Sequence, residues 1–148
     1  MQDLTIRRLN ETETECALRL VWEVFLDYEA PDYTQAGVDA FYRSIHDARY
    51  CAMLCVYGAF VHGTLAGVLA TRSGGSHIAL FFVKGAYHRQ GIGRRLFETA
   101  LAACGAGKMT VNSSPYAVPV YHRLGFRDTG AEQVTDGLRF TPMERPAD

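Results

Sequence analysis

Two glycines one residue apart, with arginines around them, form the segment of this chain whose residue types point most directly to chemistry. Residues 81–96 read FFVKGAYHRQGIGRRL, so an apolar run leads into Gly91 and Gly93 and then into a basic stretch. Glycine lets the backbone approach a ligand closely because it has no Cβ. The first N–H groups of a helix lack partners within the helix and favour an anion. With Arg89, Arg94 and Arg95 nearby, the segment predicts a cradle for a pyrophosphate group.

Two well-known phosphate-binding loops do not fit this segment. The dinucleotide fingerprint requires a third glycine where Leu96 stands, and no Lys-Ser/Thr pair follows as in a P-loop. A tight strand-to-helix turn with a solvated basic face remains as an alternative interpretation. The absence of acidic residues between Asp47 and Glu98 favours the anion site.

The cradle requires a strand before it and a helix after it, and the hydrophobic pattern predicts both. We expect a central strand at 77–84 and a helix at 94–104, with further strands and three further helices along the chain. The further strands are expected at 4–9, 50–60, 65–71 and 108–111, the helices after a Thr12–Glu15 capping box, after Thr34 and from Ser114-Pro115, and the last strands at Phe126 and 138–143. Strands come first as hairpins and then alternate with helices. This order predicts one α/β (α+β) domain over 1–148, with a mixed, mostly antiparallel central sheet flanked by helices.

A second motif follows the cradle at residues 111–126, which read VNSSPYAVPVYHRLGF. The polar-x-x-Gly-x-Gly pattern at 88–93, after an apolar strand ending in Val83, resembles the acetyl-CoA-binding motif of the GNAT superfamily of N-acetyltransferases. The ending Tyr-x-x-Leu-Gly-Phe at 121–126 is similar to the next strand and helix of that family, and the order of elements matches as well. The resemblance spans nearly the whole chain and implies a GNAT-like acyl-CoA N-acyltransferase fold with acetyl-CoA as co-substrate and no metal.

The resemblance also implies roles for particular residues. The backbone of Phe82 and Val83 would bind the pantetheine arm, and the amide of Asn112 would reach it from the next strand. The pyrophosphate would be held, largely by main-chain N–H groups, at His88, Arg89, Gln90, Gly91, Ile92, Gly93 and Arg94. Tyr121 would act as general acid toward the departing coenzyme A thiolate. The alternative for Tyr121 is a core aromatic, because it shares one helical face with positions 117, 120 and 124.

The chain departs from the family pattern at two places. His88 stands where Gln or Arg is usual, and the strand at 77–84 contains no Asp or Glu to act as general base. We therefore consider His77, at the start of that strand, and Glu29 or Asp32, in the break between the first two helices, as candidate bases. Tyr28, Glu29 and Asp32, with His77, are our candidates for the acceptor pocket. The alternative for the segment 27–33 is a solvated loop.

These observations predict an N-acetyltransferase that transfers an acetyl group directly, in a ternary complex, to a primary amine of a small molecule or peptide. No cysteine lies near Tyr121 in the motif, which disfavours a covalent acetyl-enzyme. One alternative is a non-catalytic acyl-CoA-binding sensor or regulatory domain, which the missing strand carboxylate would favour. Another is a nucleotide- or phosphate-binding module of a different fold, which would leave the motif at 112–126 unexplained.

The formal net charge of −1 conceals a strong division along the chain. Residues 1–47 carry four basic and ten acidic side chains, residues 48–127 nine and one, and residues 128–148 two and five. The overall balance argues against a nucleic-acid partner. The basic block contains the proposed cradle, and the acidic first block suits a cationic acceptor.

Composition and cysteine usage complete these expectations. No apolar run approaches the ~20 residues of a membrane span, and the start Met1-Gln2-Asp3 lacks the order of a signal peptide. We therefore expect a cytoplasmic protein without membrane contact, whose four cysteines are buried, reduced thiols and which has no metal site. The apolar last strand is compatible with a homodimer.

Overall fold

A computed structural model describes residues 3–105 and 107–148, so residues 1, 2 and 106 of the expected domain lie outside it. In chain order the elements are β1 Leu4–Arg8, η1 Glu11–Glu13, α1 Thr14–Tyr28, η2 Ala30–Asp32, α2 Gln35–Ile45, α3 Ala48–Ala52, β2 Cys55–Val61, β3 Thr64–Arg72, β4 His77–Val83, η3 Gly85–Tyr87, α4 Ile92–Ala103, β5 Met109–Ser113, α5 Val118–Arg123, β6 Arg127–Asp128, β7 Gln133–Thr135 and β8 Leu138–Arg145. The expected α/β class with a mixed, mostly antiparallel sheet flanked by helices is confirmed.

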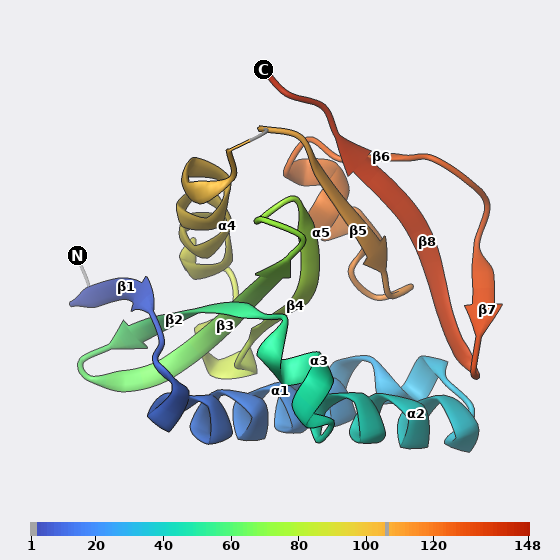
Figure 1. The fold of residues 1–148 in the computed structure, drawn as a ribbon, viewed down its shortest axis with the longest axis horizontal. Coiled ribbons are helices and arrows are strands. Elements are labelled where there is room, and N and C mark those ends of the chain that lie inside the picture. Colours follow the sequence, from blue (N-terminus) through green and yellow to red (C-terminus); the bar gives the residue numbers. More distant parts are fainter. Residues whose placement is uncertain (1–2, 106) are drawn as a thin grey trace.

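The strands form one sheet in the order β1-β2-β3-β4-β5-β8-β6, and β7 pairs with the N-terminal end of β8, at Leu138 to Phe140. Strands β4 and β5 are parallel, and the neighbouring pairs β3–β4 and β5–β8 are antiparallel. The parallel pairing includes only His77 with Thr110 and Ile78 with Val111. Beyond Ile78 the two strands separate, and this separation opens the middle of the sheet (Figure 1).

Helices cover both faces of the sheet (Figure 1). On one face, α1 buries Val21 and Phe25 against Val68 and Leu80 of the central strands. On the other face, α4 and α5 pack on the sheet through a second cluster that includes Leu96. The first helix is amphipathic and the central strands are apolar on both sides, as a sheet between two helical layers requires.

Local signals explain several element boundaries, including two that differ from expectation. Thr34 caps α2 as expected, since its Oγ1 accepts the Gly37 N–H at 3.3 Å. The expected Thr12–Glu15 capping box is wrong: helical structure already begins at Glu11, and the Glu13 carboxylate accepts the Asn10 N–H at 3.1 Å. The segment expected to begin a strand at residue 50 is helical up to Ala52, because Asp47 accepts the Arg49 N–H at 2.8 Å and starts α3.

The cysteine expectation is also partly wrong. All four thiols are free, but only Cys104 is buried. Cys16 is exposed on α1, while Cys51 and Cys55 are half-buried. The apolar run that suggested burial of Cys51 is interrupted by the turn of α3, which brings this residue toward the surface.

Candidate functional site

The gap between β4 and β5 exposes one backbone edge of β4. Lys84 donates its N–H to Ala66 of β3 at 2.9 Å, and Phe82 lies opposite Val68 in the same ladder. Because backbone groups alternate in direction along a strand, those of Phe81 and Val83 face the gap. The geometry therefore favours Phe81 with Val83, rather than Phe82 with Val83, as the pair whose backbone can bind an extended ligand.

His88 lies across the end of this edge. Its Nε2 is 2.6 Å from the Val83 carbonyl oxygen, so this nitrogen donates a hydrogen bond to it. The His88 ring is 5.0 Å from the ring of Tyr28, which in turn lies 5.3 Å from Tyr116. The Tyr28 hydroxyl occupies the space that a Cβ at Gly85 would need. The three rings thus form one side of the cleft above the gap.

The glycine segment adopts a cradle conformation at the start of α4. Gly91 has φ +80° and precedes the first helical residue, Ile92, so the helix starts two residues earlier than expected. A Cβ built at Gly91 meets no atom within 4 Å, so the space beside it is open. Arg89 also has a positive φ of +62°. Backbone N–H groups at this helix start are available to an anion, and the open space fits a pyrophosphate group.

Three side chains of the cradle have structural partners. Ile92 is 1% exposed and belongs to the core, so only its main chain can contribute to an anion site. Arg94 donates from Nη2 to the Arg123 carbonyl at 3.3 Å and so connects the cradle to the end of α5. Gln90 donates from Nε2 to the Ala86 carbonyl at 3.2 Å.

The cradle, the gap and the ring cluster enclose a cavity of about 480 Å³, which we call the first cavity. Eight of the residues expected to bind the coenzyme line it: Phe82, Val83, His88, Arg89, Gly91, Ile92, Gly93 and Arg94. Gln90 does not line it, and Asn112 lines a different cavity. Tyr28, expected on the acceptor side, lines the first cavity instead.

A second cavity, of about 390 Å³, lies on the β8 side of the gap. Its walls come from α1, α2, α3, the sheet and the β7–β8 hairpin. The two cavities share Glu29, Phe81, Phe82, Ala117 and Tyr121. They are therefore adjacent spaces with a common boundary at these residues.

Tyr121 occupies this boundary from α5. It is 5% exposed, and its ring packs against Phe81 at 6.0 Å and Phe126 at 5.3 Å between centroids. Burial, and secondly the negative charge of Glu29, raise the pKa of Tyr121 above its ordinary value, so the hydroxyl stays protonated. The core interpretation of Tyr121 is confirmed, because its ring is buried. The residue also lines both cavities, and its role as general acid stays a prediction.

Glu29 occupies the same boundary from the end of α1. Its N–H bonds the Phe25 carbonyl at 2.9 Å, and the short helix η2 follows immediately. Burial raises the pKa of Glu29 to about 7; a hydrogen bond with Ser114 acts in the opposite direction, and the charge of Asp32 adds to the rise. A carboxyl group with this pKa exchanges a proton readily near neutral pH. Sequence reasoning included Glu29 but did not identify Ser114 as its partner, because Ser114 was considered only as a helix cap.

The other two candidate bases lie elsewhere. His77 is at the opposite end of β4, with Nδ1 2.8 Å from the Thr110 hydroxyl, and burial lowers its pKa. Asp32 is exposed, and its main-chain carbonyl accepts a bond from Arg139 at 3.2 Å. Neither residue lines either cavity, so the structure brings together only Glu29 and Tyr121 among the residues proposed for proton transfer.

Within 3–105 and 107–148, no three His, Cys, Asp or Glu residues come close enough together to hold a metal ion. Among the helices in these ranges, none is both long and apolar enough to cross a membrane.

Comparison with known proteins identifies the class to which this fold and cleft belong. The acetyltransferase (GNAT) domain family matches residues 29–146, and the chain therefore belongs to the GNAT acetyltransferases. No curated protein matches the chain.

Solved structures with the same fold include two named as N-acetyltransferases. A GCN5-related N-acetyltransferase from Rhodopseudomonas palustris superposes with a TM-score of 0.83 at 18% identity, covering 99% of this chain and 98% of that one. PaiA N-acetyltransferase from Thermoplasma acidophilum, solved in complex with coenzyme A, has a TM-score of 0.72 at 19% identity, covering 97% and 99%. YjaB from Escherichia coli, solved in its apo form, has a TM-score of 0.75 at 17% identity, covering 98% and 99%. At these identities the likeness concerns the fold.

Proposed function

We propose that this acetyltransferase uses acetyl-CoA to acetylate a primary amine by direct transfer within a ternary complex. The observation that carries the proposal is the shared boundary of the two cavities, which both include Glu29 and Tyr121. A donor in the first cavity and an acceptor in the second would meet at these two side chains. Holding two reactants in contact converts a bimolecular step into an effectively unimolecular one.

The residues that line the first cavity suit both the pyrophosphate and the pantetheine arm of coenzyme A. The N–H groups at Gly91, Gly93 and Arg94 and the charge of Arg89 would hold the pyrophosphate. The β4 edge at Phe81 and Val83 would bind the pantetheine arm like an added strand. The Phe81 N–H faces the gap and would donate to the carbonyl oxygen on which negative charge develops. Bound acetyl-CoA supplies the thioester carbon for the new C–N bond and the thiolate released when the C–S bond breaks.

Glu29 and Tyr121 would handle the protons of this exchange. The acceptor reacts as a neutral amine, and its nitrogen loses one proton to the Glu29 carboxylate. Tyr121 donates its hydroxyl proton to the departing sulfur, and the proton on Glu29 then returns to the Tyr121 oxygen. Both residues regain their starting states, with the acetylated amine and free thiol as products. The chain lacks a carboxylate on β4, and Glu29 supplies one from the end of α1 instead. This supports catalysis over the alternative of a sensor domain.

Measurement of thiol release with acetyl-CoA and a panel of amines tests the proposal, together with calorimetry for binding. We expect coenzyme A to bind while ATP and NAD do not, and free thiol to appear only when an amine is present. Coenzyme A binding without thiol release from any amine class would contradict the proposal. Binding of ATP or NAD instead of coenzyme A would favour a nucleotide-binding module. The compartment and the homodimer remain expectations from the sequence.

A further inference from the structure

One wall of the second cavity consists of stacked aromatic rings. Phe25 of α1 stacks on Phe41 of α2 with 4.0 Å between ring centroids, and on Tyr33 at 5.7 Å. The Phe41 ring lies 5.9 Å from the ring of Phe82 on β4. Phe25 and Phe82 are buried, while Phe41 and Tyr33 are half-buried and border the open space. Their mutual packing fixes the rings, so this wall is formed before any ligand arrives.

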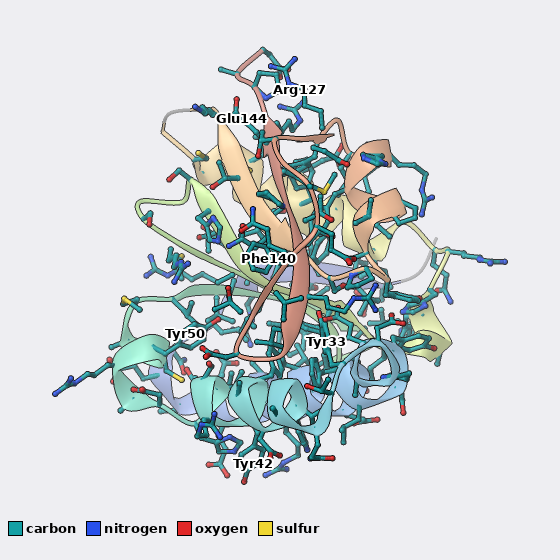
Figure 2. All side chains as sticks on the ribbon, turned by 90° about the vertical axis from the view of Figure 1, so that its right-hand side faces the viewer. Tyr33, Tyr42, Tyr50, Arg127, Phe140 and Glu144 are labelled. Carbon is teal, nitrogen blue, oxygen red and sulfur yellow. The ribbon has the colours of Figure 1, made fainter. Side chains whose placement is uncertain are left out.

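The opposite wall comes from the β7–β8 hairpin. Its apolar members are Phe140 and Leu138 of β8, and Thr135, Asp136 and Arg139 line it as well, while Tyr50 of α3 lies on the helix side (Figure 2). In Figure 2, Phe140 lies on the β8 strand at the centre, with Tyr33 and Tyr50 lower down, nearer the helices. The β7–β8 hairpin that carries Phe140 is held against α2, because the backbone of Gly137 packs directly on Gly37. The space between the walls is therefore a slot lined on two sides by aromatic carbon.

The charged groups of the slot lie at its two ends. Glu29 is at the inner end, on the boundary with the first cavity, and Asp136 is at the exposed tip of the hairpin. Arg139 is the cation among the described lining residues, and its guanidinium pairs with Glu132 at 3.2 Å and donates to the Asp32 carbonyl at 3.2 Å. The charges thus favour a positive group at the inner end, beside Glu29, and Arg139 is already paired and so is not free to bind a ligand carboxylate.

We infer that the acceptor is a monoamine carried on an aromatic body without a carboxylate, with the ring between the Phe41–Tyr33 wall and Phe140 and the amine at Glu29. This inference rests on the proposed function, because that function is what places the amine at Glu29. Ring pairs stabilise a complex beyond the burial of their area. A polyamine has no ring to fill the space between the aromatic walls, and its further charges would meet only Asp136, at the exposed end of the slot. An aromatic amino acid would place its carboxylate near Glu29, where like charges repel.

Calorimetry on the protein saturated with coenzyme A tests this inference without any turnover. The probes are 2-phenylethylamine, n-butylamine, spermidine and L-phenylalanine. We expect 2-phenylethylamine to bind at least about 10-fold more tightly than each of the other three, as a gain of about 1.4 kcal/mol implies. Equal or tighter binding of n-butylamine, spermidine or L-phenylalanine would overturn the inference.

Two variants locate the site. Phe140→Leu keeps an apolar side chain of similar size and removes the ring, and we expect it to weaken 2-phenylethylamine binding several-fold. Phe60→Leu is the matched control, because Phe60 lines neither cavity and packs under Arg7. An equal effect of the two variants would place the amine elsewhere and overturn the assignment.

Thiol release from acetyl-CoA separates the inference from the proposed function. Tight binding of 2-phenylethylamine without thiol release from any amine would leave the slot assignment standing and contradict the proposed transfer. Faster thiol release with spermidine or n-butylamine than with 2-phenylethylamine would support the transfer and contradict the aromatic acceptor.

Discussion

Glu29 and Tyr121 line the same boundary from opposite sides, one at the end of α1 and the other on α5. The charge of Glu29 contributes to the raised pKa of Tyr121, and burial affects both groups. A carboxyl that exchanges its proton near neutral pH and a phenol that keeps its proton are thereby placed together. Separated pKa values of this kind define distinct acid and base roles.

Replacing Tyr121 with phenylalanine removes the proposed acid and leaves the packed ring in place. We expect kcat to fall about 10²-fold, with coenzyme A affinity nearly unchanged. Steady-state kinetics and calorimetry measure the two quantities. Tyr57→Phe serves as control, because Tyr57 packs against the same core cluster and lines neither cavity. Unaltered turnover of the Tyr121 variant would remove the residue from its role.

The pH dependence of kcat/KM should show an acidic limb near pH 7, below which Glu29 is protonated and cannot accept the amine proton. We expect Glu29→Gln to remove this limb and to lower kcat about 10²-fold. The amine produces a limb of its own, which moves with the pKa of the amine chosen. A limb near pH 7 that persists in the Gln variant would assign the titration to another group.

Stability should report the same group independently of activity. The folded-state pKa of Glu29 is raised from its ordinary value to about 7, so the folded protein binds a proton that the unfolded chain has already lost. Stability from this group is therefore present at low pH and is lost as pH rises toward 7. We expect wild type to lose about 2–3 kcal/mol relative to Glu29→Gln between pH 5 and pH 8. Urea unfolding of both proteins at pH 5 and pH 8 measures this difference. If the difference in free energy of unfolding between wild type and Glu29→Gln were the same at both pH values, the raised pKa of Glu29 would be contradicted.

The cradle can be tested with two glycines of matched conformation. Gly91 has φ +80° and Gly63 has φ +79°, and a Cβ at either meets nothing within 4 Å. Aspartate at either position adds similar backbone strain, but only at Gly91 does it place a negative charge in the proposed anion site. We expect Gly91→Asp to abolish coenzyme A binding by equilibrium dialysis and Gly63→Asp to retain it. Retained binding in the Gly91 variant would exclude the loop.

The contact of Gly37 with Gly137 should hold the wall of the second cavity. A Cβ at Gly37 would collide with the backbone of Gly137, so Gly37→Ala must displace the hairpin. We expect a loss of about 1–3 kcal/mol in the free energy of unfolding and a raised KM for the amine, with KM for acetyl-CoA nearly unchanged. Gly105→Ala is the control, because the space around Gly105 is open. Equal stability of both variants would show that the contact is not tight.

Features of the fold that depend on near neighbours in the chain were predictable. Thr34 caps α2, and Gly91 precedes α4, because caps and glycine turns act over three or four residues. Competing local signals explain the two wrong boundaries. Asn10, rather than Thr12, precedes the first helical residue, and Asp47 caps α3 inside a run that was expected to be a strand. The strand β7 was not predicted, since its three exposed residues carry no burial pattern.

The amino-acid sequence by itself determined the class of the fold, the glycine segment before α4 and the residue types available for proton transfer, because these depend on spacing along the chain. It left Glu29, Asp32 and His77 equal as bases, and it placed Asn112 with the coenzyme rather than in the second cavity. Only the tertiary structure showed that Glu29, alone of these three, lines both cavities, and that Asn112 lines the second. The position of a side chain relative to a cleft depends on where β4 and β5 separate, and on which helix end reaches that gap. Strand register and helix packing set both, and they arise from contacts between residues far apart in the chain.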